Sequence, residues 1–147
     1  MVTIKKHAVN SSHDAKISVV IPTYNEEESV GEVLRKLLEL EGLLPPMEII
    51  VVNDGSTDRT VQEVAKFPSV IQVSHEKNLG KGAALRTAFR VASGDILVVQ
   101  DADMEYCPSE IPKLVWPILT GQADVVYGSR FKGKHEGMSF SHLVGNK

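Results

Sequence analysis

The chain has 147 residues, of which 42% are hydrophobic, a length that suits one domain with a single core. Its formal net charge of -3 at pH 7 lacks the basic field of a nucleic-acid-binding domain, so we expect no nucleic-acid partner. One cysteine, Cys107, excludes an internal disulfide, and no apolar run approaches the roughly 20 residues that span a bilayer.

Residues 1–15 show no hydrophobic periodicity, and we expect them to be a flexible leader before one domain over residues 16–147. The first buried strand is predicted over residues 17–21 and is stopped by Pro22. A helix over residues 27–41 follows, because its apolar residues recur at helical spacing. A second strand over residues 48–52 leads through a turn into a helix over residues 59–66.

A third strand over residues 70–73 precedes a helix over residues 83–92, and residues 96–99 form a short strand buried on both faces. A helix over residues 111–119 and a strand over residues 124–127 complete the series. Strands that alternate with helices at this spacing predict an α/β fold, a Rossmann-like and mainly parallel sheet with helices on both faces. In such a sheet, ligands bind beyond the carboxyl ends of the strands.

Two aspartates, Asp101 and Asp103, follow the strand over residues 96–99 directly. Alternate residues of an extended segment face the same way, so both carboxylates can face one point. Burying two carboxylates is costly unless a cation compensates them, and Mg²⁺ or Mn²⁺ with substrate phosphates fits that need. The competing interpretation is a turn whose aspartates cap the next helix.

Polar residues also follow the other predicted strands. Tyr24 offers a flat face to a base or ribose, although it could be a half-buried packing residue. Asp54 could accept a pair of hydrogen bonds from a base edge, or it could bond its own turn. Lys81 lies between two glycines without the spacing of a P-loop, so we expect a helix start with close backbone approach. His75 is solitary, and we expect it to be structural.

Five segments of the chain, in this order, resemble motifs of the family 2 glycosyltransferases of GT-A fold: residues 22–26, 52–58, 78–82, 101–103 and 128–131. Within that family the chain is similar to the polyprenyl-phosphate sugar transferases, of which dolichyl-phosphate mannosyltransferase is a familiar member. The similarity runs from about residue 17 to the end of the chain, and it implies the nucleotide-sugar-binding half of a GT-A domain.

The resemblance implies a role for each matching position. Nucleotide contacts fall on residues at three strand ends: Pro22, Tyr24, Glu26, Val52, Asp54, Asp101 and Ala102. The implied metal ligands are Asp101, Asp103 and Glu105. Arg130 matches a basic residue near the sugar diphosphate, and with Asp101 and Asp103 it forms the implied catalytic set.

The activity that the resemblance implies is metal-dependent hexosyl transfer with inversion, from GDP-mannose or a UDP-sugar to an acceptor such as dolichyl or undecaprenyl phosphate. A lipid phosphate is already anionic at neutral pH, which agrees with the lack of an evident general base. Residues 138–147 resemble a membrane-facing helix on the acceptor side, beyond which these relatives continue. We therefore expect a domain truncated at its C-terminus and inactive alone.

For the whole protein we expect a cytoplasmic location with peripheral contact at the membrane face, and self-association through uncovered apolar surface. Two other classes stay open. A sugar-phosphate nucleotidyltransferase shares the metal chemistry at strand ends, but residues 22–25 are not its Gly-rich, Arg-containing loop. A non-catalytic nucleotide-binding module would need the same cavity without turnover.

Overall fold

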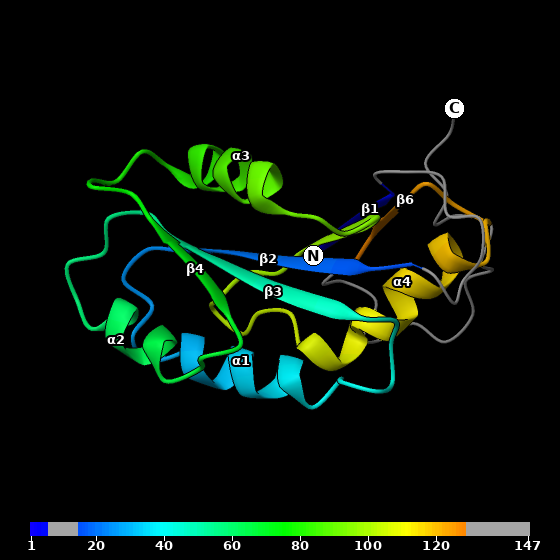
Figure 1. The fold of residues 1–147 in the computed structure, drawn as a ribbon, viewed down its shortest axis with the longest axis horizontal. Helices are drawn as coiled ribbons and strands as arrows, with labels where there is room; N and C mark the ends of the chain where they lie inside the picture. The colour runs from blue at the N-terminus through cyan, green and yellow to red at the C-terminus, as the bar shows by residue number, and fades with distance from the viewer. Residues whose placement is uncertain (6–14, 129–147) are drawn as a thin grey trace.

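The computed structural model describes residues 1–5 and 15–128. These residues form a six-stranded sheet with helices on both faces (Figure 1), which confirms the predicted α/β class. The strand order is β4–β3–β2–β5–β1–β6. The strands are β1 (Val2–Lys5), β2 (Ile17–Thr23), β3 (Met47–Asn53), β4 (Ile71–Ser74), β5 (Ile96–Val99) and β6 (Val125–Tyr127).

The four strands from β4 to β5 in this order are parallel, so their carboxyl ends meet at one edge of the sheet. The helices are α1 (Val30–Leu38), α2 (Thr60–Ala65), α3 (Lys81–Val91) and α4 (Ile111–Leu119), with a short 3₁₀ helix, η1 (Pro108–Glu110), before α4. Figure 1 shows α3 on one face of the sheet and the other three α-helices on the opposite face. None of the helices in residues 1–5 and 15–128 is long and apolar enough to cross a membrane.

Alternating side chains of the parallel strands form two hydrophobic clusters, one on each face. Ile17 and Val19 of β2 belong to the larger cluster, with residues of α1 and α4. Val20, on the opposite face, packs in the cluster that contains Ala84 and Ala88 of α3. The small side chains of α3 let the helix lie close to the sheet, which places its first residue near the carboxyl ends of β2 and β3.

Pro22 lies inside β2, so the prediction that it ends the first strand is wrong. The backbone N–H and carbonyl groups of the even-numbered residues of β2 point toward β5, as the hydrogen bond from the N–H of Gln100 to the Val20 carbonyl shows. Because β5 ends at Val99, no ladder partner lies beside Pro22 on that side, and its missing N–H costs no strand hydrogen bond. Pairing with β3 continues to Thr23.

The expected flexible leader is wrong for its first residues, which form β1 between β5 and β6. β1 is antiparallel to both neighbours, and Met1 and Thr3 are buried. The segment is only four residues long, and its buried face carries a threonine, so no hydrophobic pattern marked it. Residues 6–14 of the expected leader lie outside the described residues.

The helix predicted over residues 27–41 is shorter than expected at both ends, because α1 spans Val30–Leu38. The carbonyl of Glu26 accepts the N–H groups of Ser29 and Val30, so the chain makes a turn before the helix begins. This turn leaves Glu26 and its neighbours in a loop at the carboxyl end of β2.

Candidate functional site

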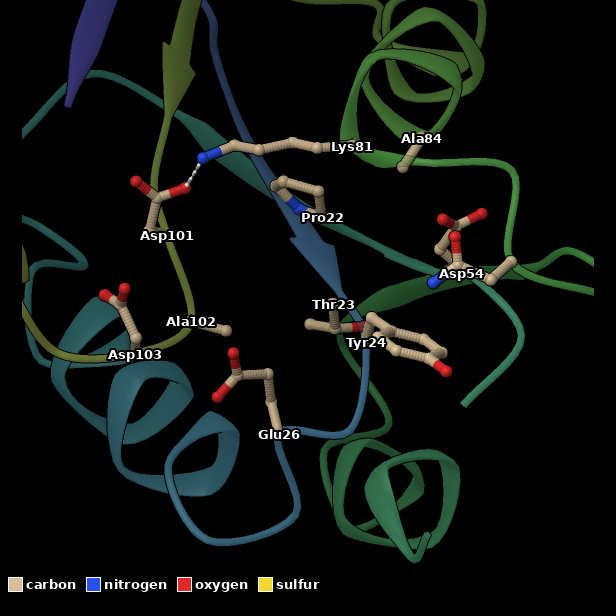
Figure 2. Close-up of a pocket in the computed structure, with 11 residues that line it drawn as sticks. Pro22, Thr23, Tyr24, Glu26, Asp54, Lys81, Ala84, Asp101, Ala102 and Asp103 are labelled. Atoms are coloured by element: carbon tan, nitrogen blue, oxygen red, sulfur yellow. Dashed lines mark hydrogen bonds and ion pairs between the residues drawn. The ribbon is translucent and has the colours of Figure 1, made fainter. Parts of the chain in front are cut away.

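A cavity of about 300 Å³ lies beyond the carboxyl ends of β2, β3 and β5, the edge that the sequence predicts. Its volume is at the lower end of the range for small-molecule sites. The loops after these strands line it, together with the start of α3 (Figure 2). The lining residues are Pro22, Thr23, Tyr24, Glu26, Asp54, Asn78, Lys81, Ala84, Asp101, Ala102 and Asp103.

The three aspartates lie at two ends of this cavity, and Glu26 lies between them (Figure 2). Figure 2 shows Asp54 at one end, Asp101 and Asp103 at the other, and the ring of Tyr24 between them. Tyr24 is 46% exposed, so its ring is available to a ligand and is not a packing residue of the core. The arrangement can hold an elongated molecule with a ring at one end and anionic groups at the other.

Asp54 is buried and is held by groups distant in the sequence. His75 Nδ1 lies 2.6 Å from Asp54 Oδ1, and the N–H of Gly80 donates to Oδ2 at 2.7 Å. The N–H of Leu79 donates to both oxygens. Burial alone would raise the pKa of Asp54, but these hydrogen bonds outweigh it and lower the pKa, so Asp54 is an anionic acceptor at neutral pH.

A hydrogen bond to the turn itself, the alternative role considered for Asp54, is made by its neighbour Asn53 instead. Asn53 Oδ1 accepts the N–H of Ser56 at 3.1 Å. Gly55 lets the distant loop approach Asp54, because an added Cβ would lie 2.5 Å from the backbone of Lys77, and its φ is +72°. The expected helix start is confirmed, since α3 begins at Lys81 directly after this loop. The close backbone approach expected at the two flanking glycines is wrong, because a Cβ added at Gly80 would have nothing within 4 Å and one at Gly82 would meet only the Arg86 side chain at 3.8 Å.

The loop that carries Tyr24 and Glu26 is bound to the turn after β3. The N–H of Glu26 donates to Thr60 Oγ1 at 2.8 Å, and the N–H of Glu27 donates to Asp58 Oδ2 at 3.1 Å. These hydrogen bonds join two strand ends that are more than thirty residues apart in the sequence. The loop therefore forms a fixed wall of the cavity, with Glu26 lining it.

Asp101 and Asp103 both line the cavity, as their spacing predicts. The carboxylate of Asp101 contacts the ammonium group of Lys81, which reaches across from α3 (Figure 2). Buried Gln100 closes the loop beneath them, because its Nε2 donates to the carbonyls of Asp101 and Tyr106 at 2.9 Å each. Neither aspartate caps a helix, since the caps of η1 and α4 are Cys107 and Glu110, so the helix-capping interpretation is wrong.

Asp101 and Asp103 fit a site for Mg²⁺ or Mn²⁺ that substrate phosphates complete, because such ions commonly take one or two carboxylates and phosphate oxygens. Within residues 1–5 and 15–128, no group of three His, Cys, Asp or Glu side chains could hold a metal unaided. Glu105 is exposed and is not among the residues that line the cavity. Its role as a third ligand stays a prediction.

The remaining predicted residues have different placements. Pro22 and Ala102 line the cavity, whereas the Val52 side chain is fully buried in the cluster under α3. Arg130 and the segment over residues 138–147 lie outside the described residues. The sequence interpretation missed Asn78 and Lys81 as cavity residues and His75 as the partner of Asp54.

The profile of glycosyl transferase family 2 matches residues 18–144. The chain belongs to this family. The dolichol-phosphate mannosyltransferase of Pyrococcus furiosus is 41% identical over 131 residues, which cover 85% of this chain and 36% of that protein. This agreement confirms the family that the motifs indicate.

Solved structures of similar sequence share the fold. A mannosyltransferase from Pyrobaculum calidifontis in complex with GDP-Man and Mn²⁺ is 33% identical, with a TM-score of 0.56 over 67% of this chain and 31% of that one. Glucosyl-3-phosphoglycerate synthase from Mycobacterium tuberculosis, in complex with Mn²⁺, UDP and glucosyl-3-phosphoglycerate, is 35% identical, with a TM-score of 0.62 over 73% and 40%. The GT-A class is thus confirmed, and the chain spans less than half of each of these proteins.

Proposed function

We propose that this chain binds the donor of a glycosyltransferase, a nucleoside diphosphate sugar, with the base at Asp54 and the diphosphate near Asp101 and Asp103. One observation carries the proposal: a single cavity has a fixed anionic acceptor at one end and two adjacent carboxylates with a lysine at the other. A base with a ring N–H suits the first end. A diphosphate with a divalent metal suits the second.

Mg²⁺ or Mn²⁺ between Asp101 and Asp103 would offset the negative charge that develops on the departing diphosphate. Two structural neighbours that contain Mn²⁺ support this choice of ion. Arg130 near the diphosphate completes the proposed catalytic set with Asp101 and Asp103, and Glu105 is a further proposed metal ligand. Pro22, near the end of β2, and Tyr24, in the loop that follows, would contact the base and ribose.

The proposed reaction is a single displacement with inversion. An oxygen of the acceptor bonds to the anomeric carbon while the bond from that carbon to the donor diphosphate breaks, and the electron pair stays on the diphosphate. An anionic phosphate acceptor has no proton to lose, so the cavity needs no general base. Similarity to a dolichol-phosphate mannosyltransferase supports a polyprenyl phosphate acceptor. The similar structures in complex with GDP-Man and with UDP support a GDP- or UDP-sugar donor. A cytoplasmic membrane-face location and self-association stay predictions.

Calorimetric titration of the chain with GDP and UDP, each with Mn²⁺ and with EDTA, tests the donor site. We expect saturable binding of at least one nucleotide, weaker in EDTA and much weaker in Asp54→Ala. Glu63→Gln is the matched control, because Glu63 is on α2, is not among the residues that line the cavity and pairs with nearby Lys66. Folded chain that binds neither nucleotide would refute the proposal. Sugar transfer to polyprenyl phosphate by a protein that contains this chain tests the acceptor, because a non-catalytic binding module would transfer no sugar.

A further inference from the structure

We propose that His75 is a positioning residue for nucleobase recognition, which fixes the orientation of the Asp54 carboxylate for contact with a base N–H. The inference rests on the proposed nucleotide site and goes beyond it by adding a residue that does not line the cavity. It starts from the contacts of His75, whose side chain is 12% exposed. Nδ1 lies 2.6 Å from Asp54 Oδ1, and Nε2 lies 2.8 Å from Thr87 Oγ1.

Three elements hold the imidazole ring between these partners. His75 follows β4, and its N–H donates to the carbonyl of Asn53 at 2.9 Å, which continues the pairing of β4 with β3. That pairing sets His75 beside Asp54, the residue after Asn53. Thr87 lies on α3, so its hydroxyl reaches the ring from the helix that covers this face. The ring is therefore fixed from both sides.

The chemistry of the two contacts sets the direction of the hydrogen bonds. An ionised Asp54 only accepts, so Nδ1 must carry the proton that it donates to Oδ1. A threonine hydroxyl both donates and accepts, so Thr87 satisfies Nε2 in either protonation state of the ring. Thr87 thus orients the ring without dictating its charge, and the ring in turn orients Asp54.

Counting the partners of Asp54 shows what is left for a ligand. A carboxylate has about four lone-pair positions. His75 takes one on Oδ1, Gly80 takes one on Oδ2, and the N–H of Leu79 lies between the two oxygens. These three donors occupy at least three of the positions, so the carboxylate has room for at most one further donor, not for the pair of hydrogen bonds that the sequence suggested. A ring N–H, as in uracil or guanine, matches a single anionic acceptor.

Two substitutions of His75 separate positioning from packing. His75→Asn can keep a donor near Nδ1 and so keep the contact with Asp54, whereas His75→Gln places its amide near Nε2 and loses that contact. We expect His75→Gln to weaken binding of the preferred nucleoside diphosphate about tenfold, which is the scale of one hydrogen bond to a charged group. His75→Asn should stay within about threefold of the parent chain.

The control ligand is pyrophosphate with Mn²⁺, which has no base and binds at the other end of the cavity. His75→Gln should bind pyrophosphate as the parent chain does, and Thr87→Val should show a smaller loss for the nucleotide alone. Equal loss of nucleotide and pyrophosphate, or an unchanged nucleotide affinity in His75→Gln, would overturn the inference.

The same titrations separate this inference from the proposed function. Suppose that the parent chain binds nucleotide and that Asp54→Ala weakens this binding. If His75→Gln and Thr87→Val then both leave the nucleotide affinity unchanged, only the role of His75 fails. If the folded parent chain binds neither nucleotide nor pyrophosphate, the proposed function fails and this inference fails with it. Should His75→Gln melt below the assay temperature, the Thr87→Val result decides, because that change removes one hydroxyl and keeps the side-chain shape.

Discussion

Replacing Glu48 by glutamine tests how the amino ends of the strands are held together. These ends lie at the opposite edge of the sheet from the cavity. Glu48 Oε1 accepts a hydrogen bond from the Ser18 hydroxyl at 2.6 Å and one from the Ser93 N–H at 2.7 Å. Oε2 lies 2.6 Å from Lys16 Nζ. One carboxylate on β3 therefore joins the start of β2 to the turn between α3 and β5.

The size of the effect follows from the pKa of this carboxyl group. Burial alone would raise the pKa of Glu48, but the hydrogen bonds from Lys16, Ser18 and Ser93 lower it from 4.5 to about 2. At about 1.4 kcal/mol per pKa unit, the full shift corresponds to about 3 kcal/mol. The Lys16 side chain is 40% exposed, and water screens the pair. We therefore expect Glu48→Gln to lower the free energy of unfolding by about 1–2 kcal/mol at pH 7.

The same lowered pKa fixes the pH dependence. Between the folded-state and unfolded-state values the unfolded chain binds more protons, so this contribution is full above about pH 5 and is lost as the pH falls toward 2. Urea unfolding of both chains from pH 7 to pH 3 should show a difference that shrinks on acidification. Glu63→Gln, which removes an exposed pair with Lys66, should change stability by less than about 0.5 kcal/mol. A Glu48→Gln chain as stable as the parent at pH 7, or a difference independent of pH, would refute this reasoning.

Three further tests, two of them with a comparison variant, have distinct expected outcomes. Asp103→Asn should weaken nucleoside diphosphate binding far more with Mn²⁺ than in EDTA. Asp54→Asn should weaken this binding under both conditions. Equal losses for Asp103→Asn with Mn²⁺ and in EDTA would show that Asp103 does not act through a metal. Gly55→Ala should destabilise the chain by about 2 kcal/mol or more in urea unfolding. Gly42→Ala, with a similar φ of +81° but nothing within 4 Å of its Cβ, should cost less. Deleting residues 1–5 should lower stability by more than about 1 kcal/mol, because it removes the strand between β5 and β6; an unchanged melting temperature would contradict this.

The parallel part of the fold could be predicted because its strands carry continuous apolar runs. β3 and β5 are buried on both faces by helices, so their sequences contain almost no polar interruption. The prediction failed where tertiary pairing decides the structure. β1 is short and half polar and becomes a strand only because β5 and β6 lie on either side of it. Pro22 continues β2 because of where β5 ends, which the sequence around Pro22 does not indicate.

The candidate site was predicted in part for the same reason. Asp101 and Asp103 could be paired from their spacing alone, because they are two residues apart in one segment. The partners of Asp54 are 21 to 26 residues away, at His75, Leu79 and Gly80. No short window of sequence contains both ends of these contacts, so a histidine that binds Asp54 looks solitary until the sheet is assembled.

The three aspartates of the cavity show why residue type alone does not settle chemistry. The Asp54 carboxylate is stabilised by hydrogen bonds from the chain's own donors, so a neutral base can approach it without a counter-ion. At the other end, Lys81 is the one basic residue among the described residues that line the cavity, and it lies near Asp101 and Asp103. One ammonium group cannot offset two carboxylates and an incoming diphosphate, so an anionic ligand there requires a further cation. We therefore propose the metal at Asp101 and Asp103, and we expect nucleotide binding to divide into a metal-independent part at Asp54 and a metal-dependent part at these two residues.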